Sequence, residues 1–142
     1  MPAKLLPSGV TTITPPAVSV LSKVCQVART DTAAFDAFAL PAGAVVLGAY
    51  VVGTTASDAA TTATVRLGSV GTPTGVINDF SVKTNGAGYY AVGAQGGSLL
   101  STQLTADTKL QARYAETGTA STTGGPWLLK VEYYLPQAGN TY

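Results

Sequence analysis

Apolar and polar side chains alternate along most of this chain with the two-residue period of β-strands. The alternation is clearest near the end of the chain. There one face carries Trp127, Leu129, Val131, Tyr133 and Leu135, and the other carries Lys130, Glu132 and Tyr134. Segments of this kind predict eight strands, over residues 18–29, 35–40, 45–52, 61–67, 76–83, 88–92, 108–116 and 127–135. No segment keeps a 3.6-residue period, so we expect no helix longer than about two turns.

Two of these segments carry further local signals. Residues 45–52 are a nearly continuous apolar run, which predicts a central strand covered on both faces. Asn85-Gly86, between the fifth and sixth segments, is typical of a type I′ turn and predicts a β-hairpin there.

The last two strands are predicted to have well-defined inner faces. Leu110, Ala112 and Tyr114 share one face of the seventh segment. If the seventh and eighth strands pair across the loop 117–126, then Tyr114 lies opposite Leu129 on the inner side. The assignment of inner faces does not depend on that pairing. Short strands separated by small polar loops indicate a β-sandwich or a β-barrel.

The chain divides into an arm, one domain and a tail. Four of its eight prolines fall within the first sixteen residues, and proline cannot donate to a β-ladder. We therefore expect residues 1–17 to form an extended arm, residues 18–136 a single β-sandwich domain, and residues 137–142 a tail. Such a length can bury a sufficient core without disulfides or metals.

Charge is sparse. Only 11% of the residues are charged and the net charge is +1, whereas about a quarter of an average soluble domain is charged. The eight basic residues are scattered and form no stripe that could neutralise phosphates, so we expect no direct nucleic-acid partner. A surface with so little charge favours association with other proteins.

Catalytic chemistry has few residues to use. The chain has no histidine, which excludes Ser-His-Asp and Cys-His machinery. Ser81 and Lys83 share a strand face and are the only local Ser/Lys pair oriented for a catalytic dyad, but we interpret them as a solvated face. Asp31 and Asp36 are the nearest carboxylates along the chain, and we interpret both as turn residues. We expect no enzymatic activity, no cofactor and no small-molecule substrate.

The single cysteine and the chain's start bear on the compartment. Cys25 lies among apolar residues of a strand, so we expect a buried and inert thiol. One cysteine cannot form an internal disulfide, which favours folding in a reducing cytosol. Residues 1–7 lack a signal-peptide core, and the longest apolar stretch, 44–52, is too short to span a membrane.

An alternative reading is a carbohydrate-binding β-sandwich, because tyrosines and one tryptophan could form a sugar platform. The candidates are Tyr89, Tyr90, Trp127, Tyr133, Tyr134 and Tyr142. Adjacent tyrosines on a strand point to opposite faces, and inner-face parity places Trp127 and Tyr133 in the core.

Several stretches resemble a known family. They are Leu40-Pro-Ala-Gly-Ala-Val-Val-Leu47, Ala63-Thr-Val-Arg-Leu-Gly-Ser69, Leu110-Gln-Ala-Arg-Tyr114 and Pro126-Trp-Leu-Leu-Lys-Val-Glu-Tyr-Tyr-Leu-Pro136. Together they resemble the capsid cement or decoration proteins of tailed bacteriophages, such as that of a Bordetella podophage, over roughly residues 20–136.

The resemblance implies an all-β, jelly-roll-like sandwich that binds the outside of an icosahedral shell in the virion. It implies that the protein clamps neighbouring subunits of the major capsid protein, without cofactor or catalytic residues, and is made in the cytoplasm of the host bacterium. The alternative becomes a carbohydrate-binding module of a phage tail or adhesin.

Two partner-binding regions are expected. We expect a homodimer, with an open sheet edge near Tyr134 and Pro136. Partner-binding residues are predicted in the arm and at this edge: Pro2, Leu5, Leu6, Pro7, Pro15, Pro16, Tyr134 and Pro136.

Overall fold

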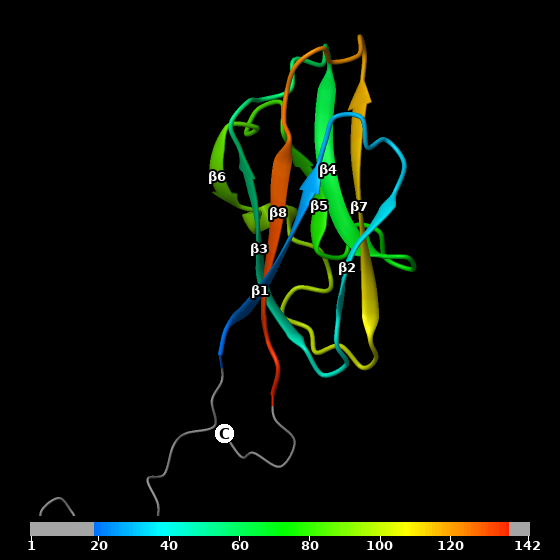
Figure 1. Cartoon of the computed structure of the whole chain (residues 1–142), viewed down its shortest axis with the longest axis vertical. Coiled ribbons are helices and arrows are strands. Elements are labelled where there is room, and N and C mark those ends of the chain that lie inside the picture. The colour runs from blue at the N-terminus through cyan, green and yellow to red at the C-terminus, as the bar shows by residue number, and fades with distance from the viewer. Residues whose placement is uncertain (1–18, 137–142) are drawn as a thin grey trace, which may run out of the picture.

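A computed structural model of the chain describes residues 19–136 (Figure 1). The predicted arm 1–17 and tail 137–142 lie outside the described residues. The strands are β1 (Leu21–Val27), β2 (Phe35–Leu40), β3 (Val45–Gly53), β4 (Thr62–Ser69), β5 (Ile77–Ser81), β6 (Gly88–Ala91), β7 (Thr108–Thr117) and β8 (Trp127–Tyr134). In this part of the chain the helical structure is a single turn of 3₁₀-helix, η1 (Gly93–Gln95). The all-β prediction is confirmed, and each predicted strand is present.

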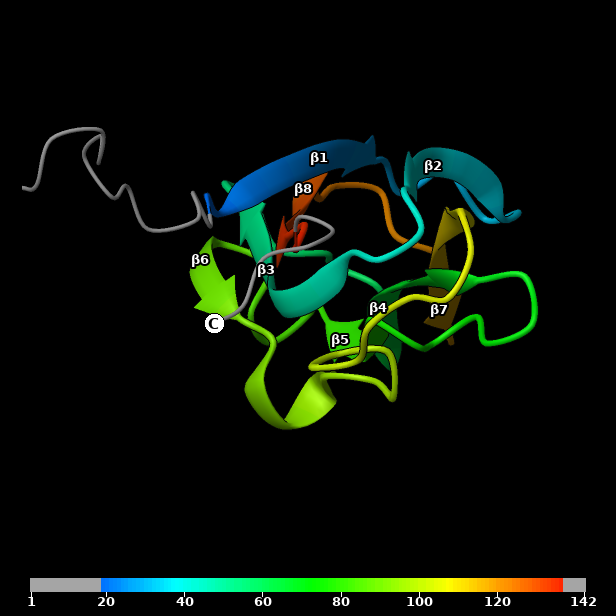
Figure 2. The same ribbon diagram turned by 90° about the horizontal axis from the view of Figure 1, so that it is seen from below.

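The strands form two antiparallel four-stranded sheets packed face to face (Figures 1 and 2). The first sheet has the order β1-β8-β3-β6 and the second has the order β2-β7-β4-β5. Strand β1 thus pairs with β8, β2 with β7, β3 with β6 and β4 with β5. This is the order obtained when one long eight-stranded hairpin is rolled up, and it defines a jelly roll.

The core lies between the two sheets and uses one face of each strand. The inner face of β8 consists of Trp127, Leu129, Val131 and Tyr133, all buried as predicted. The inner face of β7 supplies Leu110, Ala112 and Tyr114, also buried. Leu135, which was assigned to the inner face with them, is 39% exposed because it lies beyond the end of β8.

Two predicted pairings are wrong. Strands β7 and β8 do not form a hairpin: β7 lies in the second sheet and β8 in the first. Tyr114 therefore pairs with Val65 of β4, and Leu129 pairs with Cys25 of β1 and Val51 of β3. The loop 118–126 crosses from one sheet to the other. Nothing in its sequence distinguishes this crossing from a hairpin loop.

The Asn85-Gly86 hairpin is also wrong, since β5 and β6 belong to different sheets. Gly86 is needed for close packing instead of a tight turn. A Cβ atom there would lie 1.9 Å from the Val82 carbonyl oxygen and 2.6 Å from Ala56 Cα. The carbonyl of Gly86 accepts a hydrogen bond from Trp127 Nε1 at 2.9 Å.

Strand β3 is central in its sheet, as predicted, but it is covered on one face only. Val46, Ala49 and Val51 are buried, whereas Leu47 is 44% exposed. The register against β8 shifts between Val46 and Gly48, so Leu47 is the extra residue of a β-bulge. A continuous apolar run here therefore marks an apolar outer face.

The predicted open edge near Tyr134 is wrong as well. Tyr134 belongs to β8, which lies between β1 and β3 inside the first sheet. The outermost strands of that sheet are β1 and β6, and those of the second sheet are β2 and β5.

Candidate interaction surface

The outer face of the first sheet is apolar and aromatic. Two rows of side chains cross it side by side. One row is Val24, Lys130, Tyr50 and Ala91, and the next is Gln26, Leu128, Val52 and Tyr89. We call Val24, Tyr50, Val52, Tyr89 and Leu128 the apolar face.

Its members are open to solvent to an unusual extent for large apolar side chains. Val24 is 50% exposed, Leu128 42% and Tyr89 59%, while Tyr50 and Val52 are half-buried. Single exposed apolar residues are ordinary, but a contiguous set on one sheet is a sign of an interaction site.

The charges on this face neutralise each other. Lys130 and Glu132 form an ion pair at 3.4 Å. Lys130 Nζ also lies 5.5 Å from the centroid of the Tyr50 ring, and the Tyr50 and Tyr89 rings are 5.4 Å apart and tilted by 32°. Lys130, Glu132, Tyr50 and Tyr89 therefore form one cluster, in which the two charges are paired with each other.

The pKa values of the cluster reflect these contacts. The hydrogen bond and charge of Glu132 raise the pKa of the Tyr50 hydroxyl above its usual value. The same carboxylate is the main cause that raises the pKa of Lys130. At neutral pH Lys130 is charged and Tyr50 is neutral.

Two shallow depressions flank the apolar face. One, of about 250 Å³, is lined by Gln26, Val52, Gly53, Thr54, Pro126 and Leu128. The other, of about 300 Å³, lies at the β3 bulge and is lined by Leu47, Gly48, Ala49, Tyr50, Ala91, Val92, Gly93 and Leu100. Both lie beside exposed apolar side chains, so they belong to the same surface as the apolar face.

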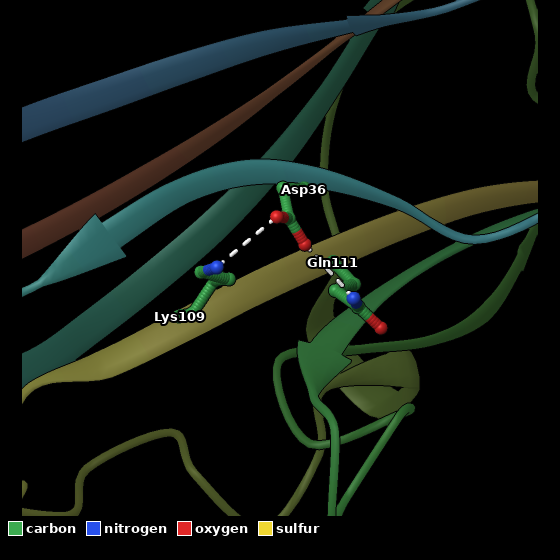
Figure 3. A network of polar contacts seen from close by, with 3 residues as sticks. All are labelled: Asp36, Lys109 and Gln111. Atoms are coloured by element: carbon green, nitrogen blue, oxygen red, sulfur yellow. Dashed lines mark hydrogen bonds and ion pairs between the residues drawn. The ribbon is translucent and has the colours of Figure 1, made fainter.

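The outer face of the second sheet is polar by contrast. Figure 3 shows Asp36 of β2 between two side chains of β7. Lys109 Nζ lies 3.1 Å from the Asp36 carboxylate, and Gln111 Nε2 donates to its other oxygen at 2.9 Å. These two contacts lower the pKa of Asp36, the Gln111 hydrogen bond contributing most. The two faces of the sandwich therefore differ sharply in chemistry.

The catalytic candidates raised from the sequence are not brought together. Lys83 Nζ donates to the carbonyl of Ala59 at 2.6 Å, and Ser81 Oγ accepts from the backbone of Thr84 at 3.2 Å. Each side chain thus holds a turn or loop.

The two carboxylates Asp31 and Asp36 contact different partners and do not form a pair. Asp31 accepts from the backbone N–H of Ala28 at 2.8 Å, as a turn residue does, whereas Asp36 pairs with Lys109. Among residues 19–136 no group of three His, Cys, Asp or Glu side chains is placed to hold a metal ion.

Cys25 is buried on the inner side of β1, as predicted. Burial raises the pKa of its thiol to about 12, with a smaller contribution from the charge of Asp31. The nucleophilic thiolate is therefore strongly disfavoured at neutral pH.

A polar cluster at the loop end of the sandwich has a structural role. Tyr114 Oη donates to Glu116 Oε2 at 2.6 Å and lies 2.8 Å from Ser57 Oγ. The same Glu116 oxygen accepts from the Ser121 backbone at 3.1 Å, and Arg29 donates to the Ser121 carbonyl at 2.9 Å. The cluster fastens the loop 118–126 to β7 and to the loop after β3.

The predicted partner-binding residues fall into two groups. Pro2, Leu5, Leu6, Pro7, Pro15 and Pro16 lie outside the described residues. Tyr134 and Pro136 are both half-buried, and Tyr134 pairs with Val45. Their part in binding a partner stays a prediction.

The sugar-platform candidates are mostly not available. Trp127 and Tyr133 are buried in the core, as parity predicted. The aromatic pair that does reach solvent includes Tyr50, which sequence reasoning missed. Its position two residues from Val52 in the run 45–52 was a usable signal, because it fixes Tyr50 on the face opposite Val51.

Two solved structures that match this chain are phage capsid structures. A chain in the capsid asymmetric unit of cyanophage Pam1 is 25% identical, with a TM-score of 0.64, and the match covers 96% of this chain and 100% of that chain. A chain in the acid-stable capsid structure of the Helicobacter pylori bacteriophage KHP30 is 15% identical, with a TM-score of 0.55, over 84% of this chain and 94% of that one. At 15% identity the second match shows the shared fold alone.

No family model and no curated protein matches the chain. The structural neighbours are therefore phage capsid chains, while the narrower resemblance to a Bordetella cement protein stays a prediction. No helix within residues 19–136 has the length and apolar character needed to cross a membrane.

Proposed function

We propose that this protein is a bacteriophage capsid cement protein, which binds the outside of an icosahedral shell and clamps neighbouring subunits of the major capsid protein. The observation that carries the proposal is the match with a chain of the cyanophage Pam1 capsid asymmetric unit, which spans 96% of this chain and 100% of that one. A match over the full length of both chains argues for a similar role as well as a shared domain type.

The apolar face is the surface we propose to lie against the shell. Val24, Leu128 and Tyr89 are each more than 40% exposed in the isolated chain. Burying such side chains contributes roughly 25 cal/mol for each Å² of apolar area removed from water. The polar outer face of the second sheet would then point away from the shell surface that the apolar face covers.

Within residues 19–136 the catalytic candidates Ser81, Lys83, Asp31 and Asp36 make local structural contacts, which is compatible with a structural role. In this role the protein would strengthen the shell against the pressure of packaged DNA without contacting that DNA. Each copy would bridge two capsid subunits, and many copies would act together through multivalency.

The test is co-sedimentation of the purified protein with empty shells of the phage that encodes it. Val24→Asp places a charge on the apolar face, and Val70→Asp places the same charge on a valine that is 69% exposed in a turn outside that face. We expect Val24→Asp to weaken shell binding roughly tenfold or more, because a charge would be buried at the interface. Val70→Asp should bind as the wild type does.

If neither the wild type nor Val70→Asp sediments with shells, the cement function is wrong. If both variants bind equally well, the shell contact lies elsewhere on the molecule.

One observation favours the alternative carbohydrate-binding function. The exposed Tyr89 ring packs against the half-buried Tyr50 ring, beside a depression of about 300 Å³. A sugar ring stacked on Tyr89 would be lost in Tyr89→Ala. Saturable binding of host cell-surface polysaccharide by the wild type but not by Tyr89→Ala would favour this function over the cement role.

Homodimer formation and a role for the arm belong to the proposal as well. Closed two-fold pairing is the commonest arrangement of identical chains. Sedimentation equilibrium of the free protein tests the dimer, and a concentration-independent monomer mass would exclude it.

A further inference from the structure

Almost every charged side chain in residues 19–136 already has a partner. The basic ones that donate a hydrogen bond or form an ion pair are Lys23, Arg29, Lys83, Lys109 and Lys130. Within this part of the chain two basic side chains do neither, Arg66 and Arg113.

These two arginines lie directly opposite each other. Arg66 of β4 and Arg113 of β7 are register partners in the middle of the second sheet. Their neighbours Val65, Leu67 and Ala112 point into the core, so both guanidinium groups stand on the outer face. Like charges directly across a strand pair are destabilising unless something compensates them.

One atom of the pair is conspicuously unsatisfied. Arg113 Nε is buried and has no hydrogen-bond partner within the described part of the chain. A buried donor without an acceptor costs stability, so this side chain is less well satisfied than the paired basic residues of the described part of the chain. The guanidinium fork fits a carboxylate through two parallel N–H···O bonds.

Residues 19–136 offer almost no carboxylate for this position. Six acidic side chains of residues 19–136 accept hydrogen bonds or form ion pairs elsewhere: Asp31, Asp36, Asp58, Asp107, Glu116 and Glu132. Asp79, which lies where the β4–β5 register shifts beside Arg66, is within 4.0 Å of neither arginine. Within residues 19–136, a second copy of the chain would therefore supply only Asp79 as a carboxylate that is not already engaged.

We propose that Arg66 and Arg113 form a receptor for an acidic side chain of a different protein. The site is a cross-strand pair of cations on the outer face of the second sheet, on the opposite side of the sandwich from the apolar face. A nucleic-acid phosphate fits less well, because the other cation on this sheet face, Lys109, is already held by Asp36 (Figure 3). On a capsid the receptor would give each copy a second contact, on the side away from the apolar face. This second contact on a capsid rests on the proposed function, while the receptor itself does not.

The test follows the Nε–H resonances of the arginines in the full-length, isotope-labelled protein by NMR. The probes are a peptide of alternating Glu and Gly, the matching peptide of Gln and Gly, and a short DNA duplex. We expect the Glu peptide alone to shift the Arg113 Nε–H resonance saturably. Arg66→Gln and Arg113→Gln should each weaken that binding by roughly tenfold or more, since charge-assisted bonds contribute about 1.5–3 kcal/mol.

Lys109→Gln is the matched control, because it removes the same charge from the same face but from a residue that is already paired. Asp79→Asn should leave binding unchanged. Both arginines are half-buried on the outer face and outside the core, so at least one of the two Gln variants is expected to fold normally.

Several outcomes would overturn the receptor. They are no saturable shift with the Glu peptide, an equal loss in Lys109→Gln, or tighter binding of duplex DNA at the same resonances. Self-association that Arg113→Gln abolishes would show the occupant to be a second copy. Peptide binding without any binding to shells would leave the receptor standing and remove the cement function, so the two proposals fail separately.

Discussion

The rings of Tyr114 and Trp127 stack across the two sheets, with centroids 5.4 Å apart and planes only 8° from parallel. Tyr114 comes from β7 of the second sheet and Trp127 from β8 of the first. Both side chains are fully buried, and each keeps a hydrogen bond, from Trp127 Nε1 to the Gly86 carbonyl and from Tyr114 Oη to Glu116. This contact ties together the sheets and the two loops beside them.

Truncation of this tryptophan should therefore be costly. We expect Trp127→Ala to lower the free energy of unfolding by about 3–5 kcal/mol, because it leaves a large cavity in a tightly packed core. Trp127→Phe should cost less, but it leaves the Gly86 carbonyl without its donor, at about 1–3 kcal/mol. Urea unfolding measures both, with Tyr89→Phe as a surface aromatic control. A loss below about 1 kcal/mol for Trp127→Ala would contradict the core placement.

Acid should loosen the loop 118–126. Asp58 accepts hydrogen bonds from the backbone of Thr122 at 2.8 Å and of Thr123 at 2.9 Å, and from the Thr122 hydroxyl at 2.7 Å. These bonds, the Thr122 hydroxyl contributing most, hold the pKa of Asp58 well below its usual value. Bonds from Tyr114 and Ser121 likewise lower the pKa of Glu116.

Because both folded-state pKa values lie below the unfolded ones, their contribution to stability is complete above pH about 4 and is lost as pH falls through the folded values. We expect Asp58→Ala to lower the urea midpoint at pH 7. Its difference from wild type should shrink steadily below pH about 4. Asp79→Asn is the control and should follow the wild type throughout. A difference that does not depend on pH would mean that the Asp58 charge is not what holds the loop.

Cys25 should react slowly in the folded protein. Its thiol is buried and its pKa is raised to about 12, so the thiolate is scarce at pH 8. An aromatic disulfide reagent should label it far more slowly than in urea, where the pKa returns to its ordinary range. Labelling of the native protein at the unfolded rate would show that the strand β1 opens readily.

The strands could be predicted from the sequence, whereas their pairing could not. Inner faces follow from the two-residue period, so Trp127, Leu129 and Val131 were placed correctly without any knowledge of neighbours. Pairing in a jelly roll joins segments far apart in the chain, such as β1 with β8, and no local signal reports that. Asn85-Gly86 resembled a hairpin turn because its residues suit one, yet the chain crosses between sheets there.

The candidate surfaces were harder to predict than the core. Tyr50 lies in an apolar run that suggested burial on both sides, and only the three-dimensional arrangement shows that its outer side is half-buried, beside Lys130 and Tyr89. Arg66 and Arg113 lie far apart in sequence and become neighbours only through the pairing of β4 with β7. Scattered basic residues in a sequence can thus form a pair in the fold.

The arm should be dispensable for folding and needed for attachment. Every buried core residue of the described domain lies between Cys25 and Tyr133. Deletion of residues 2–16 should therefore leave the thermal midpoint unchanged while weakening co-sedimentation with shells, since an extended segment can add main-chain bonds to a neighbour's sheet edge. Deletion of residues 138–142 is the control for chain shortening. Full shell binding by the arm deletion would remove the arm from the interface.

Attachment to the shell should withstand salt. The chain has only eight basic and seven acidic residues, and the ion pair on the apolar face is internal to the chain. Exposed ion pairs contribute at most about 1 kcal/mol each, and at about 1 M salt the screening length is roughly 3 Å. Apolar burial is not screened, so decorated shells should retain the protein from low salt to about 1 M salt in a sedimentation assay.

Any share of the affinity that comes from Arg66 and Arg113 should disappear over the same range. The wild type at high salt should then bind shells as Arg113→Gln does at low salt. Complete release at moderate salt would show that charge, and not the apolar face, holds the protein on the shell.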